Sequence, residues 1–422
     1  MILKNLYHIS LRIFHLLLLL VKPFNQKAAL FCKGREGLLR KISESVNPGN
    51  PVAWFHCASV GEFEQARPLI ERYRELNPGH RILLTFFSPS GYELRKNWPL
   101  ADWVFYLPLD IKRNAVKFLD AVNPRVAIFI KYEYWFNYLF ELKKRRIPSY
   151  VASAIFRPDQ RFFKWYGSIF RRMLRTFSHI FVQNSESAEL LRGIGIKCVT
   201  VAGDTRFDRV AALASESLDI ELIKHFCSKS RCWVAGSTWG PDEELISAVI
   251  QSLPQNKLII APHEVGENHI EKIISKFQEN RILRYSFIKD KDLSSGIVQQ
   301  IEESDILLID TVGILSSLYK YGSFAYIGGG FGAGIHNILE AAVYGIPVIF
   351  GPGYQKFMEA TDLIKLGGAV SVNDSDSLKQ ALKTFLSDPE KCQSAGKVCR
   401  EYVENGKGAS EKVCKTIQRW LQ

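Results

Sequence analysis

Short apolar runs alternate with amphipathic stretches along most of the chain. From Pro51 onward, runs typical of buried strands are separated by segments with helical periodicity, such as residues 64–76 and 113–122. The predicted strands of the first half cover residues 52–56, 81–86, 104–107, 126–130, 149–152 and 179–182. A β-α-β-α order with fully apolar strands indicates a parallel sheet that is covered by helices on both faces.

The same pattern restarts after Gly203. The predicted strands of the second half cover residues 232–235, 257–260, 306–309, 324–327 and 348–350. The chain is therefore predicted to be an α/β protein with two Rossmann-like domains, divided near residues 205–215. Because ligands of such sheets bind at the carboxyl ends of the strands, we expect the two domains to face a central cleft. The predicted division is a helical segment (1–48), an N-terminal domain (49–208) and a C-terminal domain (209–422).

The helical segment contains a dense apolar run at residues 13–21, IFHLLLLLV. Charged and histidine residues interrupt the wider stretch too often for a typical spanning helix. Lys22 and Pro23 follow the run instead of a small-residue cleavage site, which argues against a signal peptide. Residues 1–48 carry eight Lys and Arg against two acidic residues, a balance that favours an anionic membrane surface. We expect a membrane-associated helix, and an ordinary packing helix is the alternative.

Positive charge is concentrated in the first half of the chain. The 422 residues include 55 Lys and Arg against 43 Asp and Glu, a net charge of +12. Residues 1–200 hold 31 of these basic residues and 15 of the acidic ones. A basic half suggests that one domain meets an anionic surface or substrate. Nucleic-acid binding would also fit this charge, but no helix-turn-helix, RNP or zinc pattern accompanies it.

Amino-acid composition excludes several classes of protein. A mean hydropathy of −0.04 and 47% hydrophobic residues argue against both a disordered chain and a polytopic membrane protein. The eight cysteines form no CxxC pair and no cluster with metal-ligand spacing. We therefore expect reduced thiols and neither a structural metal nor a disulfide framework.

A first candidate site lies in the turn HCASVGE at residues 56–62, between a predicted strand and a predicted helix. Ser59 and Gly61 allow a tight turn there. Glu62 then stands at the end of the strand, where a carboxylate can act as a general base. The alternative is that Glu62 only complements the positive end of the helix dipole.

A second candidate site follows the strand at 324–327. The run GGGFGAG, which includes Gly330, permits close approach of a ligand to the backbone and is predicted to open a helix whose N-terminus attracts anions. It lacks the GK[ST] ending of an ATP-binding P-loop. Asn337 and Glu340 are three residues apart on the expected helix and share a face, and Glu340 suits a pair of ribose hydroxyls. This layout is typical of a nucleotide-sugar site.

Two more loops follow strands of the same domain and could line one crevice. Gly236, Ser237 and Thr238 offer backbone and hydroxyl donors that suit a phosphate. His263 follows the next strand along the chain, where a structural or solvent-facing role is the alternative to ligand contact.

Six motifs occur in the order found in one known family. They are SVGE (59–62), YEYWFN (132–137), GDTRFD (203–208), GST (236–238), DTVG (310–313) and HNILE (336–340). Together they resemble the Kdo transferases, which move 3-deoxy-D-manno-oct-2-ulosonic acid (Kdo) from CMP-Kdo onto a lipid A precursor. The resemblance extends from the N-terminus to about Gly353.

The resemblance implies a GT-B architecture, an inverting mechanism without metal or cofactor, and a place on the cytoplasmic side of the inner membrane. The implied partners are CMP-Kdo, a lipid A precursor and the anionic membrane surface. Glu62 matches the proposed base, in one turn with Ser59 and Gly61. From the motifs and the charge pattern together, the predicted substrate-binding residues are Ser59, Gly61, Glu133, Arg157, Lys164, Gly236, Ser237, Thr238, His263, Gly330, Asn337 and Glu340. The alternative is a different GT-B glycosyltransferase, or an epimerase, that uses a UDP-sugar.

Three positions depart from the family pattern. Lys131 stands where the family commonly has Glu, Phe136 replaces a Pro, and His263 replaces an Arg. Arg157, Arg161 and Lys164 follow the strand at 149–152. Because arginine and lysine recognise phosphate well, these three are candidate contacts for the acceptor or for Kdo. A solvated basic surface is the alternative for each of them.

Overall fold

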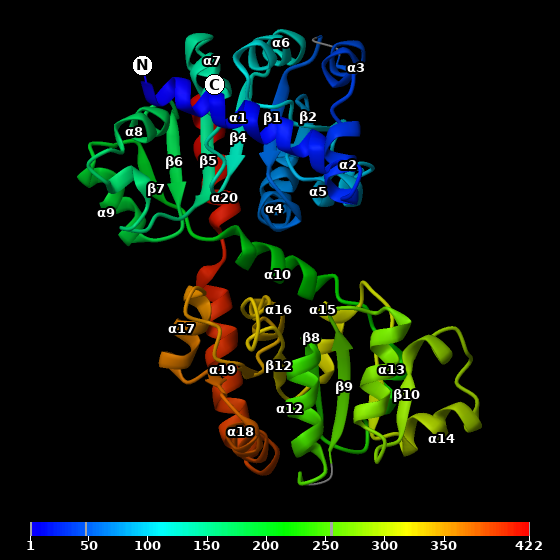
Figure 1. The fold of residues 1–422 in the computed structure, drawn as a ribbon. Coiled ribbons are helices and arrows are strands. Elements are labelled where there is room, and N and C mark those ends of the chain that lie inside the picture. Colours follow the sequence, from blue (N-terminus) through cyan, green and yellow to red (C-terminus); the bar gives the residue numbers. More distant parts are fainter. Residues whose placement is uncertain (1, 47–48, 254–255, 422) are drawn as a thin grey trace. The chain divides into compact units, whose positions relative to one another are not determined.

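The computed structural model describes residues 2–46, 49–253 and 256–421, and the chain divides into two compact units (Figure 1). The first unit contains the residues up to Arg209 together with those from Lys407 onward. The second unit contains Val210–Gly406. The predicted C-terminal domain is therefore corrected at its end, because its last residues return to the first unit. There Val413, Cys414 and Ile417 are buried among side chains of the first sheet and its helix at 60–76.

The first unit contains a parallel seven-stranded sheet in the order β3-β2-β1-β4-β5-β6-β7. Its strands are β1 Val52–Cys57, β2 Arg81–Phe86, β3 Trp103–Tyr106, β4 Val126–Ile130, β5 Ser149–Ala154, β6 His179–Val182 and β7 Val199–Val201. Its helices are α1 Ile2–Val21, α2 Gln26–Lys33, α3 Leu38–Ser45, α4 Val60–Leu76, α5 Pro89–Arg95, α6 Lys112–Val122, α7 Phe136–Lys144, η1 Arg161–Phe163, α8 Ser168–Leu174, α9 Ser185–Gly193 and α20 Ala409–Leu421. The helix α10 Thr205–Ser215 contains the boundary between the units.

Strand β1 shows how the sequence builds two cores on one sheet. Alternate residues of a strand point to opposite faces. Val52 and Trp54 belong to the core formed with α3, α6 and α7. Ala53 and Phe55 belong to the core formed with α4 and α20. Every residue of β1 is buried, which explains why the strand is apolar throughout instead of alternating.

The second unit repeats this architecture with a parallel sheet in the order β10-β11-β9-β8-β12-β13-β14. Its strands are β8 Cys232–Thr238, β9 Lys257–Pro262, β10 Ile282–Arg284, β11 Ile306–Leu308, β12 Ala325–Ile327, β13 Val348–Phe350 and β14 Ala369–Ser371. Its helices are α11 Glu221–Phe226, α12 Gly240–Ile250, α13 Glu267–Lys276, η2 Tyr285–Phe287, α14 Ser295–Glu303, α15 Leu315–Leu318, η3 Tyr319–Tyr321, α16 Leu339–Ala342, α17 Met358–Leu366, α18 Ser375–Ser387 and α19 Pro389–Gly406.

The predicted strands are all present, and three further strands were not predicted. These are β7, β10 and β14, each of three residues and each at the edge of its sheet. An edge strand is paired on one side only, and in each of these three strands a single residue is buried. Such short segments lack the dense apolar run by which the central strands are recognised in the sequence.

The apolar run at residues 13–21 belongs to α1, which is drawn blue and lies along the first unit in Figure 1. Its large apolar side chains are mostly exposed, with Leu16 at 59% and Leu20 at 70% of full accessibility. Among the described residues no single helix is long and apolar enough to cross a membrane. One bent pair, Tyr7–Val21 with Gln26–Lys33, passes that test of length and composition with a bend of 119°.

Candidate functional site

Each sheet has a point near its centre where the strand order reverses, and ligands of such sheets bind there, at the carboxyl ends of the strands. In the first unit this point lies between β1 and β4, and in the second unit between β8 and β12. The turn at 59–62 follows β1, and the YEYWFN motif at 132–137 follows β4. The GST motif ends β8, and the glycine-rich run follows β12. The strongest sequence motifs therefore lie at these two switch points.

Glu62 stands in the first turn of α4, directly after the switch-point strand β1. Ser59 is the N-cap residue of this helix, and its hydroxyl donates a hydrogen bond to the carboxylate of Glu62. This contact orients the carboxylate, which is only half-buried and remains accessible. Gly61 is exposed, and an added Cβ would meet Ser59 Oγ at an ordinary 3.7 Å, so packing does not require glycine there.

Three further side chains share the electrostatic environment of Glu62. Tyr132 has a raised pKa, chiefly through burial, and the negative charge of Glu62 adds to this effect. A hydrogen bond with Arg157 and the positive charge of Arg206 act on the same phenol in the opposite direction. Arg206 is in turn held by Asp204, with 2.8 Å between Nη2 and Oδ2. The charges of Glu62, Arg157 and Arg206 thus all act on one phenol, that of Tyr132.

Tyr132 and Arg206 were not among the predicted site residues, although both stand inside quoted motifs. The sequence signal was available in YEYWFN and GDTRFD. What it could not reveal is that Arg206, at the start of α10, acts on Tyr132 in the loop after β4, because these segments are separated by about seventy residues of chain.

Glu133 is turned into the protein, where only 8% of its surface is exposed. Its Oε2 accepts a hydrogen bond from Trp135 Nε1 at 2.7 Å and lies 3.1 Å from His56 Nε2. The other ring nitrogen of His56 lies 2.9 Å from the hydroxyl of Thr85. These contacts place Glu133 at the end of a buried chain that fixes the loop after β4. The predicted substrate contact of Glu133 stays a prediction, and its observed partners give it a positioning role.

The predicted basic contacts lie after β5. Arg157 is exposed and bonds Tyr132, as described above. Arg161 lies in η1 with an exposed side chain, and its guanidinium lies 5.9 Å from the centre of the Phe170 ring. Lys164 is the C-cap residue of η1 and is half-buried. Only Arg157 of these three is brought into the electrostatic environment of Glu62 by a described contact.

In the second unit, glycines allow the loops at the switch point to touch. A Cβ on Gly236 would lie 2.0 Å from the hydroxyl of Tyr319. A Cβ on Gly328 would lie 2.3 Å from the carbonyl of Ser237, and one on Gly330 would lie 2.6 Å from Gly351. Gly236 and Gly330 were predicted to contact substrate. Their evident role here is to let these backbone segments pack against one another.

Ser237 and Thr238 differ in what they can offer a ligand. Ser237 adopts a left-handed backbone conformation with φ of 52°, which is uncommon outside glycine and concentrates at functional sites. Thr238 is fully buried, and its hydroxyl lies 3.2 Å from Glu243 Oε1 as a hydrogen-bond donor. The Thr238 hydroxyl is therefore already bonded inside the protein, and the phosphate contact of Thr238 stays a prediction.

Asn337 and Glu340 are brought together as predicted, with 3.1 Å between Asn337 Nδ2 and Glu340 Oε1. The helix at this position is shorter than the expected one. It begins only at Leu339 and has four residues, so Asn337 precedes it. The glycine-rich run is instead a folded loop, in which Gly334 and His336 bond back to Gly329 and Gly328. The anion site expected at a long helix N-terminus is therefore absent from this described segment.

His263 forms the middle of a stack of three aromatic rings. Its ring centre lies 4.5 Å from that of Trp239 and 4.6 Å from that of His336. Trp239 Nε1 donates a 2.9 Å hydrogen bond to His336 Nε2, so this nitrogen carries no proton. Burial and the nearby His263 both lower the pKa of His336. His263 itself is exposed at the end of β9 and is available to a ligand.

No three His, Cys, Asp or Glu side chains within residues 2–46, 49–253 and 256–421 gather as a metal site would require. The expectation that the reaction needs no metal stays a prediction, since only the reaction itself can test it.

Solved structures with this architecture define the class of protein. UDP-GlcNAc 2-epimerase from Neisseria meningitidis covers 87% of this chain with all of its own length, at a TM-score of 0.61 and 15% identity. MurG from Acinetobacter baumannii covers 87% of this chain with 99% of its own, at a TM-score of 0.57 and 10% identity. Two α/β units, each built on a parallel sheet with loops gathered at its switch point, give the predicted GT-B fold, which these likenesses confirm.

The family comes from sequence comparisons. Residues 32–209 match the family model described as 3-deoxy-D-manno-octulosonic-acid transferase (kdotransferase). The transferase of that name from Aquifex aeolicus is 29% identical over 354 residues, which are 82% of this chain and 88% of the relative. The one from Haemophilus influenzae is 27% identical over 385 residues, 87% of each chain. The chain is a glycosyltransferase, and its residues 32–209 carry the Kdo transferase domain of this family model, as its motifs indicate.

Proposed function

We propose that this protein transfers Kdo from CMP-Kdo to a lipid A precursor in lipopolysaccharide core biosynthesis, with inversion and without a metal ion. The names of its relatives support the transferred sugar. The position of Glu62 carries the mechanistic part of the proposal. It is a half-buried carboxylate at a switch point, oriented by Ser59, and its charge acts on the phenol of Tyr132 together with the charges of Arg157 and Arg206.

The acceptor end of the reaction requires a base. The acceptor hydroxyl must lose its proton as its oxygen bonds to the anomeric carbon of Kdo, and a carboxylate at hydrogen-bond distance can take that proton. Glu62 takes this role. Arg157 and Arg206 supply positive charge around Tyr132, which suits the carboxylate of Kdo or a phosphate of the acceptor.

The donor end of the reaction requires a nucleotide site and stabilisation of the leaving CMP. The bonded pair of Asn337 and Glu340 is suited to the ribose hydroxyls. The exposed imidazole of His263 and the backbone at Ser237 are suited to the phosphate and base. Hydrogen bonds and fixed dipoles can stabilise the phosphate that departs with the bonding electrons, without a cation.

The direct test is to incubate the protein with CMP-Kdo and a tetraacyl lipid A precursor and to weigh the product. We expect the acceptor to gain the mass of Kdo, and we expect CMP to inhibit the reaction far better than UDP. Inhibition by UDP in preference to CMP, without Kdo transfer, would favour the alternative of a UDP-sugar enzyme and would contradict the proposal.

We also propose that α1 attaches the protein to the anionic, cytoplasmic surface of the inner membrane. The support is the line of exposed apolar side chains along the second half of α1, from Ile13 to Val21. Phe24 continues this surface at 90% exposure. An apolar helix face next to basic residues is the pattern of an interfacial helix. Sedimentation with vesicles of anionic lipid tests this attachment.

A further inference from the structure

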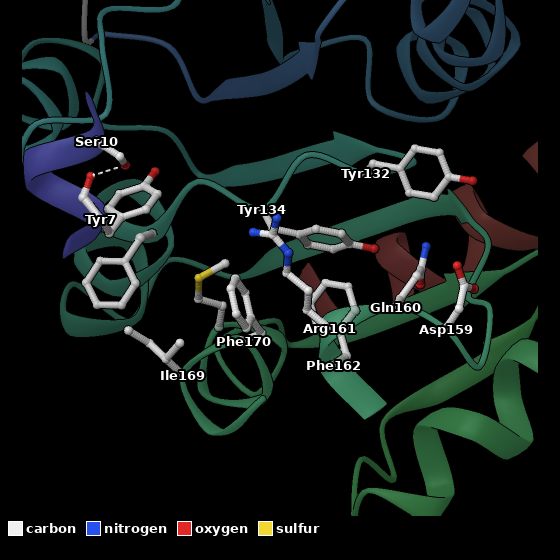
Figure 2. A pocket seen from close by; sticks show the side chains of 12 residues that line it. Tyr7, Ser10, Tyr132, Tyr134, Asp159, Gln160, Arg161, Phe162, Ile169 and Phe170 are labelled. Atoms are coloured by element: carbon white, nitrogen blue, oxygen red, sulfur yellow. Dashed lines mark hydrogen bonds between the residues drawn. The ribbon is translucent and has the colours of Figure 1, made fainter. Parts of the chain in front are cut away.

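A cavity of about 830 Å³ lies in the first unit between α1, the loop after β4, η1 and α8 (Figure 2). Its volume is within the range of small-molecule pockets, which is roughly 300–1,000 Å³. The residues that line it are Tyr7, Ser10, Tyr132, Tyr134, Phe136, Asp159, Gln160, Arg161, Phe162, Ile169, Phe170 and Met173. Tyr132, Tyr134 and Phe136 of the YEYWFN motif line it, and the proposed catalytic step makes no use of the cavity itself.

The chemistry of the cavity changes from one end to the other. Figure 2 shows Tyr7, Ile169 and Phe170 at one end and Tyr132, Gln160 and Asp159 at the opposite end. The first end is formed by apolar and aromatic side chains of α1 and α8. The second end has polar side chains from two loops at the carboxyl edge of the sheet. The cavity is therefore amphipathic along its length.

The polar end adjoins the candidate base. Tyr132 lines the cavity and also responds to the charge of Glu62, while its phenol bonds Arg157. A molecule in the cavity with its polar group at Tyr132 would thus place that group at the phenol on which the charge of Glu62 acts. Its apolar part would extend toward α1.

The helix α1 continues from the apolar end of the cavity with exposed apolar side chains. Tyr7 and Ser10 belong to α1, and the next turns of that helix expose Ile13 and Leu17 at about half of their surface. Trp165 follows η1, whose Arg161 and Phe162 line the cavity, and is 91% exposed. Exposed tryptophan and aliphatic side chains of this kind are enriched where proteins meet the membrane interface.

We infer that this cavity binds one acyl chain of the glycolipid acceptor and so delivers the acceptor hydroxyl to Glu62. The inference rests on the proposed function for the identity of the acceptor. Arg161 sits between the two ends in Figure 2, with no carboxylate partner among the described contacts, and can bind a phosphate of the head group. Because Asp159 at the polar end carries a negative charge, the part of the head group next to it should be an uncharged sugar hydroxyl.

The test fills the cavity from two independent walls. Ile169→Trp places an indole in the cavity from α8, and Ser10→Trp does so from α1. Ser168→Trp is the matched control, because Ser168 is exposed on α8 and does not line the cavity. Transfer is measured in detergent micelles, so that vesicle attachment plays no part, with a tetraacyl lipid A precursor and with its fully deacylated phosphorylated disaccharide.

We expect both cavity-filling variants to raise KM for the tetraacyl acceptor by about tenfold or more, since burial of several methylene groups is lost. KM for CMP-Kdo and for the deacylated acceptor should stay within about twofold of wild type, and Ser168→Trp should match wild type throughout. An unchanged KM for the tetraacyl acceptor in both correctly folded variants would overturn the inference. So would an equal rise of KM for the deacylated acceptor.

A binding measurement keeps this inference separate from the proposed function. A dansyl-labelled undecanoic acid should bind wild type and Ser168→Trp, be displaced by the tetraacyl precursor, and fail to bind Ile169→Trp. If wild type transfers no Kdo, the proposed function fails while this experiment still decides whether the cavity takes an acyl chain. Probe binding that Ile169→Trp and Ser10→Trp leave unchanged would place the acyl chain elsewhere and contradict the inference.

Discussion

The phenol of Tyr7 donates a 2.5 Å hydrogen bond to Asp110 Oδ2 and so ties α1 to the first unit. The same carboxylate accepts hydrogen bonds from the backbone N–H groups of Asn137 and Tyr138, in the first turn of α7. Asp110 is fully buried, and burial raises its pKa to about 6 although these hydrogen bonds act to lower it. One titratable group therefore connects the N-terminal helix to the loop and helix that follow β4.

The raised pKa of Asp110 predicts a dependence of stability on pH. The folded state favours the protonated form of Asp110 more than the unfolded state does. The resulting gain in unfolding free energy is complete below the ordinary pKa of 3.8 and is lost as the pH rises to about 6. Asp110→Asn removes this titration. Relative to the variant, wild type should lose about 2–3 kcal/mol of unfolding free energy between pH 4 and pH 7. Urea unfolding at four pH values in this range measures the difference.

Asp120→Asn is the control for Asp110, because Asp120 is an exposed carboxylate of the same unit. Its stability should follow that of wild type across the range. A wild-type protein that parallels Asp110→Asn at all four pH values would show that this carboxyl does not titrate near pH 6 in the folded state.

Replacing the candidate base should abolish most of the transfer reaction. Glu62→Gln keeps the size of the side chain but cannot accept the proton, so we expect kcat to fall by about 10²–10⁴-fold with CMP affinity unchanged. Glu75→Gln, an exposed carboxylate on the same helix, is the matched control and should behave as wild type. Turnover of Glu62→Gln near the wild-type rate would remove Glu62 from the mechanism.

The nucleotide site can be tested through Glu340. Glu340→Ala removes the carboxylate that bonds Asn337 and should weaken CMP binding by about 1–3 kcal/mol, the usual effect of losing a charged hydrogen-bond partner. Isothermal titration calorimetry gives the affinity directly. Glu390→Ala, an exposed carboxylate of the same unit, should bind CMP as wild type does. Equal CMP affinity in all three proteins would leave Glu340 as a structural residue only.

The contact of Gly236 with Tyr319 predicts a specific destabilisation. Because an added Cβ would lie 2.0 Å from the Tyr319 hydroxyl, Gly236→Ala should lower stability by about 1–3 kcal/mol through overpacking. Gly240→Ala is the control, since a Cβ there meets nothing within 4 Å. Adding Tyr319→Phe to Gly236→Ala should restore part of the loss in a thermal melt. Equal stability of Gly236→Ala and Gly240→Ala would show that Tyr319 does not pack tightly against the backbone of Gly236.

The exposed face of α1 can be tested without deleting the helix. Leu16 and Leu20 lie one turn apart, so Leu16→Glu with Leu20→Glu places two charges on one face. We expect membrane attachment to weaken by about 1.5–3 kcal/mol for each leucine removed from the apolar phase, while the melting temperature changes little. Sedimentation with anionic vesicles and thermal unfolding measure the two effects.

Leu366→Glu is the control for α1, because Leu366 is 57% exposed in the second unit. It should attach to vesicles as wild type does. The opposing interpretation is that α1 only covers the core of the first unit. A large drop in melting temperature of the α1 variant, with vesicle binding unchanged, would support that interpretation and contradict membrane attachment.

The sequence by itself determined the fold class and the location of the site loops. Central strands of a parallel sheet are buried on both faces, so they appear as apolar runs that need no tertiary information to recognise. The loops that follow β1 and β12 were identified for the same reason, since a chain that leaves such a strand must place its next residues at the carboxyl edge. The resemblance of the motifs to one family then predicted the chemistry of those loops.

Tertiary structure alone decided which of these residues share a site and which serve the fold. Glu133 and Thr238 stand in motifs as prominent as that of Glu62, but their polar atoms bond inside the protein. Tyr132 and Arg206 reach the environment of Glu62 only because distant segments of chain end at one edge of the sheet. The return of α20 to the first unit and the cavity beside α1 likewise depend on packing between segments far apart in sequence. Such contacts leave no periodic pattern along the chain.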